Sequence, residues 1–171
     1  YLQDADATAR YVAALSFCTF GDSSLVDPLA ALLKDPVDEV RIAAALALGQ
    51  IGSARAEAPL IAAFVSDDSL STRQRLNAVI LEAVGKCGSL STLKHIAAVT
   101  TYKPSETLLL QGQCRSIYRF GRRKITDPSG TNLMVEYVAN ERIPEPARLM
   151  AAHYLARTEG ISPDSSQSVK M

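Results

Sequence analysis

The chain has 171 residues, and its 18 basic and 18 acidic side chains give it a net charge of zero. Apolar residues make up 47% of the sequence, which is too much for a disordered chain, and the neutral charge argues against a general nucleic-acid binder. The longest purely apolar run, Ile42 to Leu48, is far too short to span a bilayer. The sequence therefore predicts a soluble, Ala- and Leu-rich helical domain that is long enough to bury a continuous core.

Five stretches of the chain repeat one apolar pattern, and the pattern has the spacing of a helix that is buried over much of its circumference. Each stretch closes on a glycine, and these glycines lie 31 to 39 residues apart. A period in this range indicates a repeat architecture. We expect long helices within these five stretches, which are residues 9–21, 40–52, 76–88, 109–121 and 147–160.

Shorter helices are predicted between the long ones. Residues 25–33 align with residues 56–64, and Pro28 coincides with Pro59 at an offset of 31. A proline costs little in the first turn of a helix and bends the helix further in, so the shared position predicts a shared bend. Two segments without proline take the same place further along, residues 90–99 and 132–138.

Proline and acidic residues mark the points between the predicted helices. Asp35-Pro36 ends one helix, and Asp38 and Glu39 open the next with charges that suit a helix N-terminus. The equivalent points further along the chain are residues 67–69, 103–106 and 143–146.

Together these elements predict an all-α fold, a right-handed α-solenoid of about four to five helix pairs. Each pair has a short helix (A) followed by a long helix (B), and stacking of the pairs buries the faces that one pair leaves open. Gly49 and Gly85 in the B helices let neighbouring helices approach closely. The predicted units cover roughly residues 1–21, 22–52, 53–88, 89–121 and 122–160, and the first pair is incomplete.

The ends of the chain carry two further expectations. The repeat domain is predicted to cover residues 1–161, and the polar, turn-rich residues 162–171 are predicted to form a tail or linker. The chain starts at Tyr1 without an initiator Met, which indicates a piece of a longer protein or a trimmed form.

Residues 35–52, followed by Pro59-Leu60-Ile61, closely resemble bacterial HEAT repeats of the short, HEAT-like type first noted in phycobilin lyases. The resemblance implies an armadillo-type α-solenoid and says little about activity. The amino-acid sequence of residues 27–33 and 81–88 is similar to a HEAT-repeat segment of large Bacteroidetes proteins. Those proteins carry cyclophilin-type peptidyl-prolyl isomerase domains elsewhere in the chain. No cyclophilin motif is present in this sequence, so no catalytic residue is carried over.

The strongest local charge feature is a basic cluster late in the chain. Three of its members are spaced i, i+4 and i+7, which places them on one helical face. As a hypothesis, the cluster binds an acidic peptide or a phosphate group of a partner; the alternative is a solvated helix end whose cations complement the helix dipole. The cluster consists of Arg115, Arg119, Arg122, Arg123 and Lys124.

A second set of arginines recurs at one position of the repeat. Arg10, Arg41 and Arg148 share this position, and Asn77 takes it in the third unit. They form either a ladder on the concave surface or, as we prefer, structural bonds to an inter-repeat Asp or carbonyl group, since repeated positions usually serve stacking.

Catalytic and metal-binding patterns are missing from the sequence. His95 and His153 lack the neighbouring ligands that a metal site needs, and Cys18, Cys87 and Cys114 lie singly in apolar patterns that predict free thiols. No nucleophile elbow, P-loop or dinucleotide turn is present. We therefore expect no catalytic residue, no metal and no cofactor.

The expected function is that of a non-catalytic protein-interaction scaffold. Its partner would be a peptide, another protein or another domain of the same chain, bound on the concave face that the B helices form, and not nucleic acid. The competing predictions are an accessory domain of a multidomain enzyme, such as a fused peptidyl-prolyl isomerase, or a phycobilin-lyase-like catalyst. Nothing in the sequence separates the cytoplasm from the bacterial cell envelope or periplasm as the compartment.

Overall fold

The computed structural model describes residues 1–65 and 73–161, and within these ranges the chain is helical without a strand. The predicted tail at residues 162–171 and the predicted boundary at residues 67–69 lie outside the described residues. The α-helices are α1 (Ala7–Ser16), α2 (Val26–Leu32), α3 (Asp38–Ile51), α4 (Glu57–Ala63), α5 (Gln74–Cys87), α6 (Leu90–Ala98), α7 (Thr107–Arg122), α8 (Pro128–Ala139) and α9 (Glu145–Arg157).

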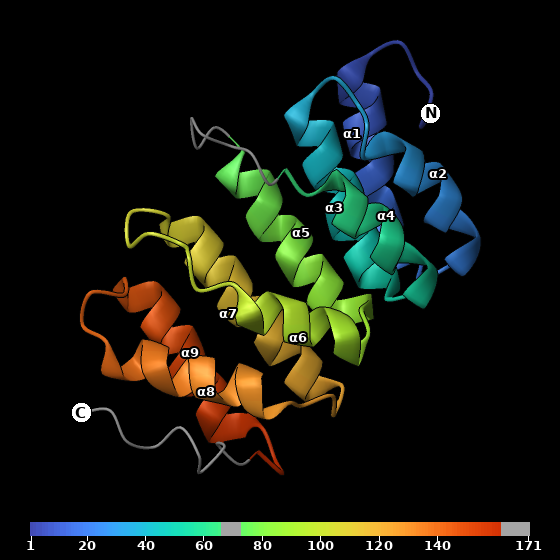
Figure 1. Cartoon of the computed structure of the whole chain (residues 1–171). Helices are drawn as coiled ribbons and strands as arrows, with labels where there is room; N and C mark the ends of the chain where they lie inside the picture. The colour runs from blue at the N-terminus through green and yellow to red at the C-terminus, as the bar shows by residue number, and fades with distance from the viewer. Residues whose placement is uncertain (66–72, 162–171) are drawn as a thin grey trace.

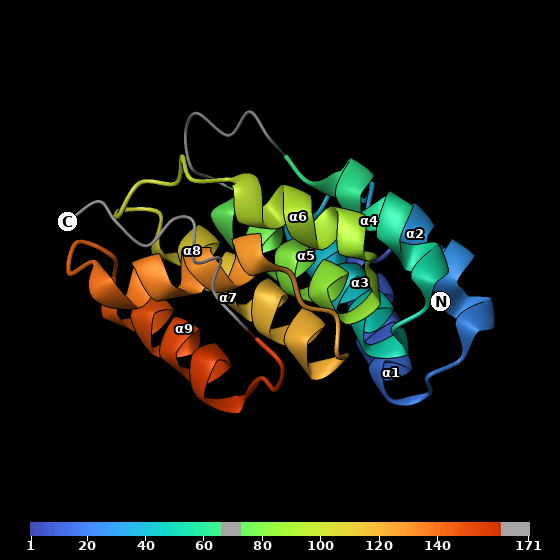
Figure 2. The same cartoon turned by 60° about the horizontal axis from the view of Figure 1, so that its bottom comes forward.

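The helices form two layers, which Figures 1 and 2 show from two sides. The B layer contains α1, α3, α5, α7 and α9, and each of these helices packs on the next B helix along the chain. The A layer contains α2, α4, α6 and α8, and each A helix packs on the B helix that follows it. Because the contacts join neighbours in this regular order, the structure confirms the predicted all-α solenoid.

Glycines on the B helices bring neighbouring helices into backbone contact. A Cβ atom added at Gly49 would lie 2.8 Å from the Cα of Ala83, and one at Gly85 would lie 2.5 Å from the main-chain oxygen of Ser116. Side chains do not fit at such distances, so the close approach predicted for these two glycines is confirmed. Gly121 also allows a close approach, because an added Cβ would lie 2.9 Å from the side chain of Thr158, the residue that follows α9.

The position of Gly121 differs from the sequence alignment. The alignment pairs Gly121 with the helix-ending Gly52 and Gly88, but α7 runs past it to Arg122. By its contacts Gly121 is equivalent to Gly49 and Gly85 at a spacing of 36 residues. The place of Gly52, which has a φ of 67°, is taken by Lys124, which has a φ of 61°. The expected glycine at this helix end is therefore replaced by a lysine in the left-handed conformation.

The repeated proline marks a change of helix type. A 3-10 turn, η2 (Ser23–Leu25), leads into α2, and a second one, η3 (Ala54–Ala56), leads into α4. Pro28 and Pro59 are each the third residue of the α-helix that follows. The missing main-chain donor of proline thus lies where the hydrogen-bond pattern changes from the 3-10 to the α type.

The two layers are not packed to the same extent. The B helices pack directly on one another along the whole stack, whereas in the described residues only α6 and α8 make extensive contact within the A layer. A stack whose layers are unequally packed is expected to curve toward the tighter layer, and this difference is what the predicted concave face of the B layer requires. The core lies between the layers and runs without interruption from Ala14 on α1 to Tyr154 on α9.

Candidate functional site

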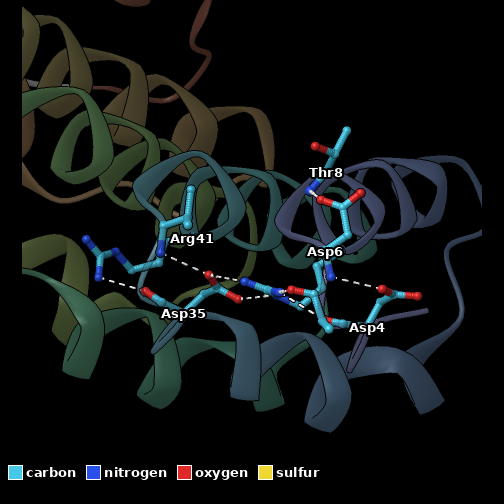
Figure 3. Close-up of polar contacts among 8 residues, drawn as sticks. Asp4, Asp6, Thr8, Asp35 and Arg41 are labelled. Carbon is cyan, nitrogen blue, oxygen red and sulfur yellow. Dashed lines mark hydrogen bonds and ion pairs between the residues drawn. The ribbon is translucent and has the colours of Figure 1, made fainter.

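Two members of the arginine set that recurs in the repeat, Arg10 and Arg41, make polar contacts around Asp35 (Figure 3). The guanidinium of Arg10 on α1 donates two hydrogen bonds to the carboxylate of Asp35, at 2.7 and 3.0 Å. Arg41 on α3 donates to the main-chain oxygen of Asp35 at 2.8 Å and pairs with Asp38. Asp35 is buried, and the hydrogen bond from Arg10 holds the pKa of its carboxyl below the usual range, although burial alone would raise it. The structural role predicted for Arg10 and Arg41 is confirmed.

The other two members of the set differ from each other. The side chain of Asn77 accepts from the main-chain nitrogen of Val65 at 3.0 Å and donates to the oxygen of the same residue at 2.9 Å, so it ties the chain after α4 to α5. Arg148 has a buried Nε with no hydrogen-bond partner in the described part of the chain. The predicted bond is therefore absent at this atom of Arg148.

The basic cluster is divided between two places. Arg119 on α7 donates from Nη2 and Nε to the Oε1 atom of Glu82 on α5, at 2.7 and 3.1 Å. Arg115 lies 3.7 Å from the other oxygen of Glu82, and Arg122 is exposed one turn further along α7. These three arginines therefore share the exposed face of the B layer, as their spacing predicts.

The remaining two members of the cluster lie elsewhere. Arg123 donates to the carbonyl oxygens of Gly85 at 3.2 Å and Gly88 at 2.8 Å, which satisfies main-chain acceptors at the end of α5. Its guanidinium carbon is 5.6 Å from the centre of the Phe120 ring. Lys124 is exposed in the turn after α7. The helix-end interpretation thus fits Arg123, and the binding hypothesis stays a prediction for the three arginines on the B layer.

One cation of this surface was not predicted. Lys86 on α5 donates to the side-chain oxygen of Gln50 on α3 at 2.8 Å, and its Nζ atom is 3.9 Å from Glu82. Burial lowers the pKa of Lys86, and the positive charge of Arg119 lowers it further, against the opposing effect of Glu82. The i, i+4 spacing of Glu82 and Lys86 is the sequence signal that places Lys86 beside this carboxylate. We call Lys86, Arg115, Arg119 and Arg122 the cationic strip.

A groove opens in the A layer between α4 and α6, on the side opposite the cationic strip. Its volume is about 800 Å³, and α5 supplies its floor. Ile61 on α4 is 48% exposed there, so a branched apolar side chain faces solvent. The groove is lined by Ala54, Glu57, Ala58, Ile61, Phe64, Ile80, Leu81, Val84, Ser89, Ser91, Thr92, His95, Ile96, Val99 and Tyr102. We call it the A-layer groove; the sequence did not predict it.

A carboxylate stands at one end of the A-layer groove. The Oε1 atom of Glu57 accepts hydrogen bonds from the main-chain nitrogen of Ser89 at 2.7 Å, the hydroxyl of Ser89 at 2.8 Å and the hydroxyl of Thr92 at 2.5 Å. Burial raises the pKa of Glu57, but these hydrogen bonds and the charge of Arg123 outweigh burial, so the pKa lies below its usual value. Glu57 is therefore an ionised group that also joins α4 to the start of α6.

Two of the three thiols are buried, and both imidazoles have partners within the fold. Burial raises the pKa of Cys87 to about 11 and that of Cys114 to about 12, so both remain protonated thiols at neutral pH. His95 bonds the main-chain oxygen of Ser91 at 2.8 Å, and the ring of His153 lies 5.1 Å from that of Tyr118. No set of three metal-ligating side chains gathers among the residues that the structure describes. Nor does any helix in those ranges have the length and apolarity to cross a membrane.

Comparison with known families agrees with the fold. A family model of HEAT repeats matches residues 1–80, and no curated protein matches the chain. HEAT repeats are commonly protein-interaction scaffolds and are generally non-enzymatic. The match gives no support to an origin beside a cyclophilin-type isomerase. The chain is thus similar to a HEAT-like repeat family over residues 1–80, and α6 to α9 continue the same two-layer pattern beyond them.

Proposed function

We propose that the chain is a non-catalytic scaffold that binds an acidic segment of a partner protein on the concave face of the B layer. The cationic strip lies on this face and carries the proposal. Its cations come from two adjacent helices, α5 and α7, so one extended segment crossing the stack meets all of them. A surface that is built by stacked repeats suits such a segment because it is long and continuous.

The charge balance of the strip favours an acidic ligand. Four cations lie there, and Glu82 is the one carboxylate that the described residues bring within 4 Å of any of them. Arg119 donates two hydrogen bonds to a single oxygen of Glu82, and Arg115 is too far from the carboxylate for a hydrogen bond. A carboxylate or phosphate from a partner would reduce the repulsion among these cations and accept charge-assisted hydrogen bonds from them.

A charge-reversal experiment tests the proposal. The probe is a fluorescent Glu-rich peptide, with a Gln counterpart of the same length, and binding is measured by anisotropy at low and high salt. The double variant Arg115→Glu/Arg122→Glu leaves the Arg119–Glu82 bond in place, and we expect it to bind the Glu-rich peptide at least about tenfold more weakly. The control variant Arg142→Glu/Arg157→Glu changes the net charge equally at exposed sites outside the strip. Equal losses in both variants would contradict a localised site.

A second variant acts in the opposite direction. Glu82→Gln removes the carboxylate that competes with the ligand, so we expect the Glu-rich peptide to bind about threefold more tightly. A purely structural role for the strip predicts no gain in affinity. Unchanged or weaker binding in Glu82→Gln would therefore contradict the proposed role of the strip.

A further inference from the structure

The A-layer groove has the dimensions of a binding site for a few side chains. A volume of about 800 Å³ lies within the range of about 300–1,000 Å³ that is usual for ligand pockets. On the α4 side its wall is formed by Ala58 and Ile61 of α4, together with Ala54 of the preceding 3-10 turn η3. The helix α4 has seven residues, which is about two turns of α-helix. Two turns are the length over which a helical ligand presents side chains at i, i+4 and i+7 spacing.

The walls of the groove favour a helix over an extended strand. The two walls are built mainly by the helices α4 and α6, and neither wall contains a β-strand. A strand would find no free edge with which to pair, and its own main-chain groups would be left without partners in an apolar cleft. A helix satisfies its main chain internally and needs only apolar side chains to fill the groove.

The charge of the groove specifies one more feature of the ligand. Glu57 is the one carboxylate among the lining residues, and no Lys or Arg lines the groove. Its Oε1 atom accepts three hydrogen bonds, whereas no hydrogen bond to Oε2 occurs in the described part of the chain. The free oxygen at the end of the apolar cleft complements a cationic side chain.

We propose that the A-layer groove docks an amphipathic helix of a partner protein, with apolar side chains along α4 and α6 and a Lys or Arg beside Glu57. This site lies in the opposite layer from the cationic strip and takes a partner of opposite charge. The chain would therefore join two different partners, or two parts of one partner, across its own thickness.

The test begins with selection from a phage-displayed library of helix-biased peptides, using the whole chain as bait. We expect the enriched peptides to carry apolar residues at i, i+4 and i+7 together with a basic residue. Ile61→Glu places a charge in the groove and should abolish their binding. Val135→Glu is the matched control, because Val135 is 43% exposed on α8, in the same layer but outside the groove. Circular dichroism and thermal unfolding of both variants show whether the fold is retained.

A double-mutant cycle then tests the role of Glu57. Glu57→Gln keeps an oxygen that accepts from Ser89 and Thr92, so the start of α6 remains bonded. We expect this variant to bind a selected peptide about fivefold more weakly than the unmodified chain does. The two should bind equally well when the basic residue of the peptide is replaced by Gln. The variant Arg115→Glu/Arg122→Glu should bind the same peptide like the unmodified chain, which separates this site from the cationic strip.

Four outcomes would overturn the proposal: no peptide enriched above background, peptides that tolerate Ile61→Glu, equal losses in Ile61→Glu and Val135→Glu, or no coupling between Glu57 and the basic residue. A groove that takes up small apolar molecules but no peptide falls under the first of these outcomes.

Discussion

The A and B layers are built from the same repeat, yet their exposed surfaces differ in packing and in charge. In the B layer, glycines let neighbouring helices touch through their backbones, and the exposed face carries the cationic strip. In the A layer, α4 and α6 stand apart over α5 and leave an apolar groove with one carboxylate. Close packing in one layer keeps α4 and α6 apart in the other, because both layers are joined through the same helix pairs.

The largest expected effect concerns the glycine contacts of the B layer. Gly85→Ala puts a methyl group 2.5 Å from a main-chain oxygen of α7, and we expect a loss of about 2–3 kcal/mol in the free energy of unfolding. Gly130→Ala is the matched change in α8, where the nearest atom lies 3.4 Å away, and it should be neutral or slightly stabilising. Urea denaturation measures the free energy of unfolding of both variants. Equal losses would mean that the two layers do not differ in packing.

A smaller effect is expected at the bond between the first repeats. Asp35→Asn removes the charge that holds Arg10 and should cost about 2 kcal/mol. Asp27→Asn is the control, because the Asp27–Arg55 pair is exposed and contributes at most about 1 kcal/mol. A larger loss for Asp27→Asn, measured by the same denaturation, would contradict the structural role of Asp35.

The contribution of Asp35 to the free energy of unfolding should also depend on pH. Its pKa in the folded chain lies below the ordinary value of 3.8, so its stabilisation is present above that value and is lost as the pH falls through the folded pKa. The difference in stability between the unmodified chain and Asp35→Asn should therefore be constant near neutral pH and shrink in acid below about pH 4. A difference that grows in acid would show that the sign of the pKa shift is wrong.

The smallest effect is expected where a polar bond joins the two layers. The hydroxyl of Tyr137 on α8 donates to Gln113 on α7 at 2.6 Å, and Gln113 in turn donates to the main-chain oxygens of Ile96 and Val99 at the end of α6. Tyr137→Phe should cost about 1 kcal/mol and leave the fold intact. In the Tyr137→Phe variant we expect faster amide hydrogen exchange at the end of α6 and unchanged exchange in α4. No change at α6 would contradict the proposed link.

The fold was predictable because its determinants are local and repeated. Apolar spacing and glycines at a near-constant period specify stacked helix pairs without knowledge of any distance. The alignment assigned the end of α7 to Gly121, which is wrong. The left-handed residue that Gly52 provides after α3 is Lys124 after α7, and a lysine does not predict this conformation. Helix lengths in the later repeats were therefore less well predicted than their existence.

The candidate sites were predictable only in part. Helical spacing placed Arg115, Arg119 and Arg122 on one face, but the turn of Arg123 toward the end of α5 depends on how two helices meet. The A-layer groove depends on the separation of α4 and α6, which the backbone contacts of other helices determine. No pattern within α4 or α6 records such a separation, so the groove becomes visible only in three dimensions.

The most direct test of two surfaces with opposite chemistry is a nuclear magnetic resonance titration of the isotope-labelled chain. The Glu-rich peptide and a selected basic helical peptide are added separately and then together. We expect two disjoint sets of shifted amides, one on α5 and α7 around the cationic strip and one on α4 and α6 around the A-layer groove, and both sets in the joint titration. Shifts in a single shared region, or displacement of one peptide by the other, would contradict the two-surface description.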